Sequence, residues 1–264
     1  MNALKVTIVQ SPLHWESIEH NLEMFSRKLA PLNEPGGLIV LPEMFNTGFT
    51  MRSESLAEPT GGKTMQWMAA LAKEKDSAIT GSLIIKENSD YFNRLVWMLP
   101  DGSFKTYDKR HLFRMAGEHE HFSAGRQKLI VNFKGWRICP LVCYDLRFPV
   151  WSRNRNPVNG EPEYDCLIYV ANWPERRNIA WKTLLQARAI ENQCYVIGVN
   201  RIGTDGNDIS YSGNSAVIDP KGTIISATNP GQESIETVSL SYPELKDYRK
   251  SFPVGLDADE FELR

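Results

Sequence analysis

Residues 137–149 read Arg-Ile-Cys-Pro-Leu-Val-Cys-Tyr-Asp-Leu-Arg-Phe-Pro. The apolar run before Cys143 is typical of a buried β-strand, and it ends where a thiol, an aromatic ring, a carboxylate and a guanidinium follow one another. A cysteine attacks a carbonyl carbon only when its sulfur is accessible, oriented and close to a base or a positive charge. Cys143 meets the positional part of this requirement, so we expect a base and an oxyanion partner elsewhere in the chain.

Two other apolar runs end on groups of the required kinds. Residues 38–43 read Leu-Ile-Val-Leu-Pro-Glu, in which Pro42 ends a short strand just before Glu43. Residues 103–113 follow an Asp-Gly turn and carry Lys109 to the point where a strand gives way to a loop. Because ligands of open α/β sheets bind at strand ends, the pattern predicts one site that contains Glu43, Lys109 and Cys143.

Strands and helices alternate along the chain, which indicates an α/β protein. This pattern alone does not separate two stacked sheets from one doubly wound sheet. The predicted helices are 18–32, 63–75, 177–192 and 242–252; the predicted strands are 6–10, 77–85, 94–99, 164–170 and 195–200, with hairpins at 132–135 and 214–226.

Several long segments, in order, resemble the nitrilase (carbon-nitrogen hydrolase) superfamily. The resemblance covers nearly the whole chain, and it implies a single carbon-nitrogen hydrolase domain over residues 1–264 with the four-layer αββα sandwich fold. The segments that carry it are 41–43, 107–113, 143–149, 170–174, 181–192 and 213–222.

The chemistry of these residue types suits amide hydrolysis. Cys143 would attack the carbonyl carbon, and Glu43 would take the thiol proton, pass it to the departing ammonia and later activate water. Lys109 and the backbone N–H of Tyr144 would stabilise the negative charge that develops on the oxygen. We therefore expect a thioester intermediate on Cys143. The other cysteines, Cys139, Cys166 and Cys194, are expected to be buried packing residues.

The resemblance also implies a supporting carboxylate in the loop after the lysine. Glu118 fits that position best, and Glu120 is the alternative. Such a carboxylate would orient Lys109 or the substrate. His111, in the same loop, is expected to be a structural hydrogen-bonding residue.

Four further residues are predicted to bind the substrate. Phe45, Phe49 and Trp173 would form an apolar wall, and Arg147 would bind a carboxylate, although it could instead form a structural salt bridge. Residues 108–115 and 170–174 look most like the bacterial ω-amidase branch, which implies hydrolysis of 2-oxoglutaramate or 2-oxosuccinamate to the 2-oxo acid and ammonia. Hydrolysis of N-carbamoyl amides is the alternative within the superfamily, as is another aliphatic amidase or nitrilase activity.

Two readings from other functional classes compete with this one. His119 and His121 alternate in sequence, and on an extended segment both could face one metal ion, with His111 as a third ligand in a metal-dependent hydrolase. No His-Glu-x-x-His helix supports this reading. A protein-interaction module that lacks catalysis is the other alternative.

Composition excludes some partners. The 264 residues carry a formal net charge of −2, which provides no basic surface for nucleic acid, and no apolar run is long enough to cross a bilayer. The chain lacks an obvious leader, so we expect a cytoplasmic protein. No phosphate-binding glycine loop is present, and we expect no cofactor. The family resemblance implies a homodimer whose interface includes residues 177–192 and the tail through Phe252.

Overall fold

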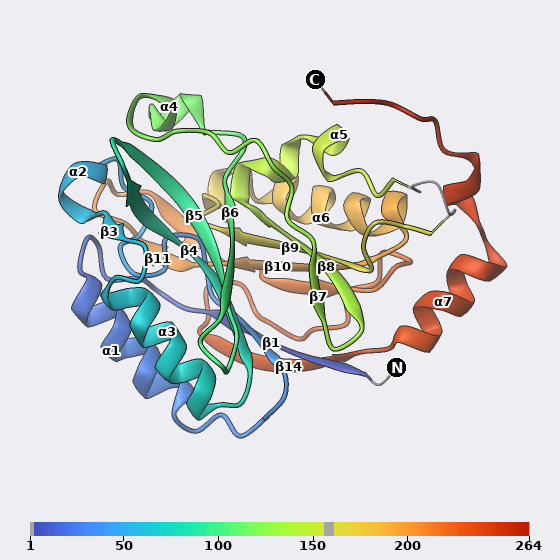
Figure 1. Cartoon of the computed structure of the whole chain (residues 1–264), viewed down its shortest axis with the longest axis horizontal. Coiled ribbons are helices and arrows are strands. Elements are labelled where there is room, and N and C mark those ends of the chain that lie inside the picture. The colour runs from blue at the N-terminus through green and yellow to red at the C-terminus, as the bar shows by residue number, and fades with distance from the viewer. Residues whose placement is uncertain (1–2, 156–160, 264) are drawn as a thin grey trace.

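The computed structural model describes residues 3–155 and 161–263, which build two stacked β-sheets with helices on both outer faces (Figure 1). Helices α1 (Ile18–Leu29) and α3 (Lys63–Glu74) cover the first sheet. Helix α6 (Asn178–Asn192) covers the second sheet. This is the four-layer αββα sandwich that the family resemblance implied.

The first sheet has the strand order β14-β1-β2-β4-β5-β6, with β3 paired to β4. Strands β1, β2 and β4 are parallel, whereas β5, β6 and β14 join them as antiparallel neighbours. The strands are β1 (Leu4–Gln10), β2 (Leu38–Val40), β3 (Glu58–Pro59), β4 (Ala78–Glu87), β5 (Asp90–Met98), β6 (Phe104–Asp108) and β14 (Ser234–Leu240).

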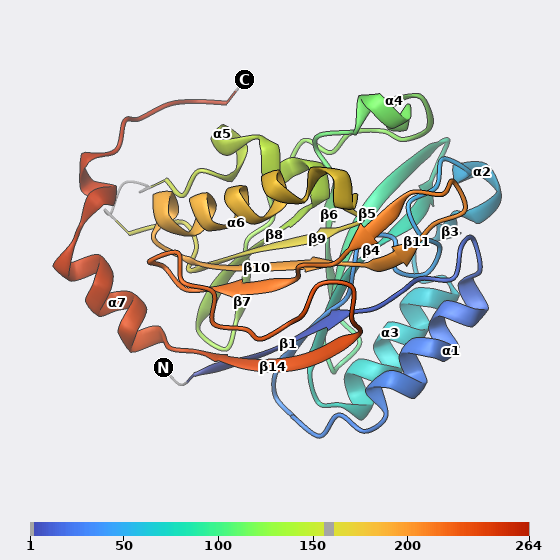
Figure 2. The same ribbon diagram turned by 180° about the vertical axis from the view of Figure 1, so that it is seen from behind.

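The second sheet has the order β13-β10-β9-β8-β7, and its three central strands are parallel. Its strands are β7 (Val131–Phe133), β8 (Trp136–Val142), β9 (Cys166–Ala171), β10 (Tyr195–Asn200) and β13 (Ala216–Ile218); β11 (Ile202–Thr204) and β12 (Ser210–Ser212) form a separate pair. Figure 2 shows α6 lying along this sheet, with α7 (Tyr242–Ser251) and the C-terminal tail beyond its end.

Short helices connect the larger elements and carry several site residues. They are α2 (Ser53–Leu56), α4 (Glu118–His121), α5 (Pro149–Ser152) and the 3₁₀ turns η1 (Arg114–Ala116), η2 (Cys143–Arg147), η3 (Glu175–Arg177) and η4 (Val254–Asp257). Within residues 3–155 and 161–263, no helix is both long enough and apolar enough to cross a membrane.

The main hydrophobic core lies between the two sheets. Ile8 and Trp97 of the first sheet and Leu141 and Val196 of the second belong to this cluster and are completely buried. A second cluster fills the space between the first sheet and its helices, as with Phe25 of α1. Because the central strands are covered on both faces, they read as continuous apolar runs, which is why most of them were predictable from sequence.

The sequence prediction missed β14. This strand pairs antiparallel with the whole of β1, from Leu4 opposite Leu240 to Gln10 opposite Ser234. It lies at the edge of its sheet and has only one well-buried residue, Leu240, so its apolar pattern is weak. Its partner strand is more than 220 residues away, and local sequence carries no signal for such a pairing.

Close packing of α6 on β10 requires a glycine at position 198. A Cβ atom there would lie 2.5 Å from Leu185 Cδ1 and 3.0 Å from Trp181 Cζ2. We predict that Gly198→Ala lowers the free energy of unfolding by about 1–3 kcal/mol, measured by urea denaturation followed by circular dichroism, because the added methyl overpacks the core. In a Leu185→Ala background the same change should cost less, since the nearest atoms are gone. Simple additivity of the two substitutions would contradict this explanation.

Candidate active site

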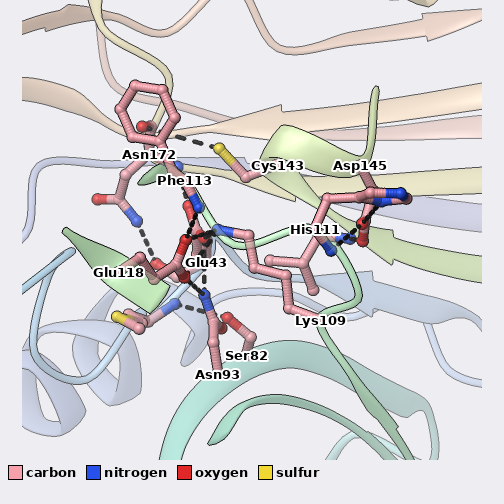
Figure 3. A network of polar contacts seen from close by, with 12 residues as sticks. Glu43, Ser82, Asn93, Lys109, His111, Phe113, Glu118, Cys143, Asp145 and Asn172 are labelled. Carbon is pink, nitrogen blue, oxygen red and sulfur yellow. Dashed lines mark hydrogen bonds and ion pairs between the residues drawn. The ribbon is translucent and has the colours of Figure 1, made fainter. Parts of the chain in front are cut away.

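Glu43 lies just beyond the end of β2, with its side chain completely buried. One carboxylate oxygen, Oε1, accepts hydrogen bonds from Lys109 Nζ at 2.9 Å and from Asn93 Nδ2 at 2.8 Å. The other oxygen, Oε2, accepts the backbone N–H of Asn172 at 2.8 Å. These donors, drawn in Figure 3, hold the carboxylate in one orientation.

Lys109 follows β6 and projects its ammonium group between two carboxylates (Figure 3). Nζ lies 2.9 Å from Glu43 Oε1 and 2.9 Å from each carboxylate oxygen of Glu118. Burial alone would lower the pKa of Lys109, but the charges of Glu118 and Glu43 outweigh it and raise this pKa above its ordinary value. Lys109 is therefore a permanent cation in the site.

Glu118 begins the short helix α4 and is completely buried. Besides Lys109, it accepts the backbone N–H of Phe113 at 2.6 Å and the Asn93 amide at 3.2 Å. Burial raises the pKa of Glu118 against the opposing effect of Lys109. The neighbouring Glu120 has a side chain that is 69 % exposed. Of the two carboxylates considered from sequence, Glu118 is thus the one that contacts Lys109.

Cys143 directly follows β8 and begins the 3₁₀ turn η2, with a backbone φ of 44°. Residues other than glycine rarely adopt this left-handed conformation, and the strain is characteristic of functional positions. The thiol points at the Asn172 carbonyl oxygen, 3.9 Å away. Burial and the negative charge of Glu43 raise the pKa of Cys143 well above its ordinary value, although Lys109 acts in the opposite direction. These surroundings therefore favour the neutral thiol over the thiolate.

Asp145 ties the lysine loop to the cysteine turn. Its Oδ1 accepts from the backbone N–H and from Nδ1 of His111, at 3.0 and 2.7 Å. Its Oδ2 accepts from Tyr107 Oη at 2.8 Å and from Val142 N at 3.0 Å. Because Tyr107 and His111 flank Lys109 in sequence, this one carboxylate fixes the lysine loop against the strand that carries the thiol. His111 has the structural role expected from sequence.

A cavity of about 650 Å³ opens above the thiol. Of the predicted substrate-binding residues, Phe49, Tyr144, Arg147 and Trp173 line it together with Lys109 and Cys143. The Phe49 ring lies 5.1 Å from Lys109 Nζ, and the Arg147 guanidinium lies 4.9 Å from the centre of the Trp173 ring.

The expectation that Phe45 forms part of this wall is wrong. Its ring is completely buried in the core between the first sheet and its helices, where it packs against Phe25 and Trp67. The physical reason is a tight turn after Glu43, in which Met44 has a φ of 42°. This turn sends the next side chain into the core instead of toward the cavity.

The structure contradicts the assumption behind the alternative metal site, namely that His119 and His121 lie on an extended segment. His119 and His121 lie on α4, a helical turn, and not on an extended segment. Side chains two residues apart on a helix point in different directions, so the two imidazoles do not converge. Across the described residues, no group of three or more histidine, cysteine or acidic side chains has an arrangement that could hold a metal ion.

Three residues of this site were not predicted from sequence. Asn93 interrupts the apolar strand β5 and is completely buried. A polar amide within an apolar strand needs hydrogen-bond partners when it is buried, so this residue could have been predicted to belong to a polar site. Asn172 contributes a backbone N–H to Glu43 and a carbonyl to the thiol, neither of which depends on its side chain. Arg177 lines the cavity from the end of η3, just before α6, where its sequence context resembles a surface arginine.

Comparisons with known proteins agree with this geometry. The family model described as carbon-nitrogen hydrolase matches residues 5–250. The omega-amidase YafV of Escherichia coli strain K12 is 48 % identical over all of both chains, and the 2-oxoglutaramate amidase of Bacillus subtilis strain 168 is 34 % identical over 82 % of this chain and 83 % of its own.

Among solved structures, a similar one is XC1258 from Xanthomonas campestris, a carbon-nitrogen hydrolase superfamily protein crystallised with an arsenic adduct in its active site. It is 45 % identical, each chain is fully covered, and the TM-score is 0.97. The family match over most of the chain, the full-length relatives and the shared fold lead to one conclusion: this chain belongs to the carbon-nitrogen hydrolase family.

Proposed function

We propose that this protein is a cysteine-dependent ω-amidase that hydrolyses the side-chain amide of 2-oxoglutaramate or 2-oxosuccinamate to the 2-oxo acid and ammonia. The observation that carries the proposal is the convergence of a thiol, a buried carboxylate and a buried ammonium beside a cavity lined by arginine. The relatives named omega-amidase and 2-oxoglutaramate amidase support the choice of substrate.

In the first half-reaction Glu43 accepts the thiol proton as Cys143 sulfur bonds to the amide carbon. The carbonyl π electrons move to oxygen, where Lys109 and the backbone N–H of Tyr144 stabilise the negative charge. Glu118 holds the lysine ammonium in place, since both of its oxygens lie 2.9 Å from Nζ. The oxyanion then collapses, the carbon–nitrogen bond breaks, and Glu43 returns the proton to the departing ammonia.

In the second half-reaction water attacks the thioester that remains on Cys143. Glu43 accepts a proton from this water, the oxyanion forms again beside Lys109, and collapse breaks the carbon–sulfur bond. The thiolate recovers its proton from Glu43, and the 2-oxo acid leaves. One carboxylate can serve both halves because it is held by three donors in a fixed position.

The cavity wall supports an anionic substrate. Arg147 stacks on Trp173, which leaves the edge of its guanidinium free to bind a carboxylate in bidentate fashion. Phe49 and Trp173 supply the apolar surface for a short carbon chain. In this proposal Arg147, Phe49, Trp173 and Tyr144 contact the substrate.

We also propose that residues 1–264 act as one carbon-nitrogen hydrolase domain in the cytoplasm, on a small amide and with neither nucleic acid nor membrane as partner. The match of the family model to residues 5–250 supports one domain. The four cysteines are all buried and unpaired, as is usual in a reducing compartment.

Ammonia release across a panel of amides tests the proposed function. Wild-type protein should hydrolyse ω-monoamides of 2-oxo dicarboxylates, and Cys143→Ala should abolish this activity, because the nucleophile is gone. Cys139→Ala is the matched control, since it removes a fully buried thiol from the strand that leads to Cys143 and should retain turnover. Hydrolysis of N-carbamoyl amides or nitriles without activity on ω-monoamides would overturn the proposal.

A second prediction separates the two neighbouring glutamates. Glu118→Gln should lower kcat by about 10- to 100-fold, because Lys109 loses one of the carboxylates that orient it. Glu120→Gln should change kcat less than twofold, as expected for an exposed side chain. Thermal melting of both variants checks that the protein remains folded. The opposite order of the two effects would contradict the assigned role of Glu118.

We further propose that the protein forms a homodimer through the outer face of α6. Ile179 and Ile190 lie on this face, eleven residues and three helical turns apart, and are 81 % and 52 % exposed. Phe252, at the end of α7, is 58 % exposed. Exposed apolar side chains on one helix face are typical of a surface that is covered in an oligomer.

The dimer is tested by measuring molar mass with size-exclusion chromatography and light scattering. Ile179→Asp should convert a dimer into a monomer, because a charge buried without a partner at an interface is strongly unfavourable. Phe104→Asp is the control, since Phe104 is an exposed apolar residue on the edge strand β6 of the other sheet. A wild-type mass equal to one chain at micromolar concentration would contradict the proposal.

A further inference from the structure

Three arginines share one wall of the cavity that contains the thiol. Arg147, Arg176 and Arg177 all line it. A fourth arginine of this cavity, Arg52, is paired with Glu16 at 2.8 Å. Within residues 3–155 and 161–263, Arg147, Arg176 and Arg177 have no such ion pair. The wall therefore carries positive charge that is not neutralised by the protein's own side chains.

Arg177 is the least satisfied of the three. Its Nη1 is buried and has no hydrogen-bond partner among the described residues. Its Nη2 lies 2.8 Å from the sulfur of Met115, which is only a weak acceptor, and its guanidinium lies 5.2 Å from the centre of the Phe113 ring. Both of these neighbours also line the cavity. A buried donor without an acceptor is costly, and a ligand that supplies the acceptor is one explanation for its persistence.

The backbone of Arg177 is fixed where it meets the cavity. The indole nitrogen of Trp173 donates to the Arg177 carbonyl oxygen at 2.9 Å. The same Trp173 ring supports the guanidinium of Arg147. One tryptophan thus positions both arginines, one through its ring face and one through its N–H group.

Electrostatics agree with this geometry. Burial lowers the pKa of Arg177, and the like charges of Arg176 and Arg147 lower it further. An anion bound between these guanidiniums would offset the cost of burying the Arg177 charge and reduce its repulsion by the neighbouring arginines.

We propose that Arg177 is a specificity-determining residue that binds, together with Arg147, the carboxylate of the substrate while its amide lies at Cys143. This inference rests on the proposed function and deepens it, because it names the residue that selects anionic amides. A neutral amide of the same length leaves two guanidiniums without an acceptor, and sites built in this way discriminate strongly against analogues that lack the polar group. Arg176 is exposed and is not part of this carboxylate-binding pair of Arg147 and Arg177.

The first test compares kcat/KM for glutaramate with that for pentanamide, in which a methyl group replaces the carboxylate. Arg177→Gln should lower the ratio of these two values by about 10- to 100-fold, the range for loss of a charge-assisted hydrogen bond. The change should appear mainly in KM, because the contact is remote from the reacting atoms. Arg177→Lys should recover part of the ratio, and the matched control Arg176→Gln should keep the wild-type ratio.

A second test needs no turnover. Cys143 is alkylated with iodoacetate, which is anionic, and with iodoacetamide, which is neutral, and the ratio of the two rates should fall in Arg177→Gln. If wild-type protein hydrolyses no monoamide, the proposed function fails while this ratio still reports on Arg177. If Arg177→Gln leaves both ratios unchanged, or if Arg176→Gln lowers them equally, the assignment of Arg177 is overturned.

Discussion

The buried ammonium of Lys109 between Glu43 and Glu118 is the constraint on which the site depends. Removing three ionised groups from water costs several kcal/mol for each group, and the cost is offset only when geometry and additional hydrogen bonds are good. Here Asn93 donates to both carboxylates, and the backbone N–H groups of Asn172 and Phe113 satisfy the remaining oxygens. The cluster therefore joins the ends of β2, β6 and β9 to α4. No single segment could adopt its position without the others.

The sandwich explains why these segments meet. Parallel strands within one sheet present their carboxyl ends at the same edge. β2 of the first sheet delivers Glu43, whereas β8 and β9 of the second deliver Cys143 and Asn172. The contact between Asn172 and Glu43 crosses from one sheet to the other, so the face-to-face packing of the sheets sets the distance between the Glu43 carboxylate and the Cys143 thiol. The packing of the central core therefore determines both the stability of the fold and the geometry of the site.

This division also explains what sequence could and could not predict. Glu43 and Cys143 were predicted as site residues because each follows an apolar run that reports a strand end. Lys109 follows a strand that is mostly polar, and it was predicted from its place at the strand end and from the joint occurrence of the three family-like segments. The choice between Glu118 and Glu120 depended on which one faces inward from a four-residue helix, and that orientation is set by the lysine it meets. Phe45 was misplaced because the turn at Met44 reverses the alternation of side chains. Strand β14 pairs with β1, and the Arg177 guanidinium contacts Met115 and Phe113. These partners are far away in sequence, so no local signal predicts either contact.

The charges that line the cavity differ between its two ends, with carboxylates near Cys143 and arginines on the opposite wall, and this difference affects the pKa of the thiol. Near Cys143 the two carboxylates outnumber the single ammonium, and together with burial they raise the pKa of the thiol. On the arginine wall the cations have no carboxylate of the described chain to neutralise them. An amide with a carboxylate at its far end would therefore be oriented by its charge before it reacts, with its uncharged end at the thiol. Such orientation converts binding energy into a productive geometry, because the amide carbonyl is placed beside Cys143 before any bond changes.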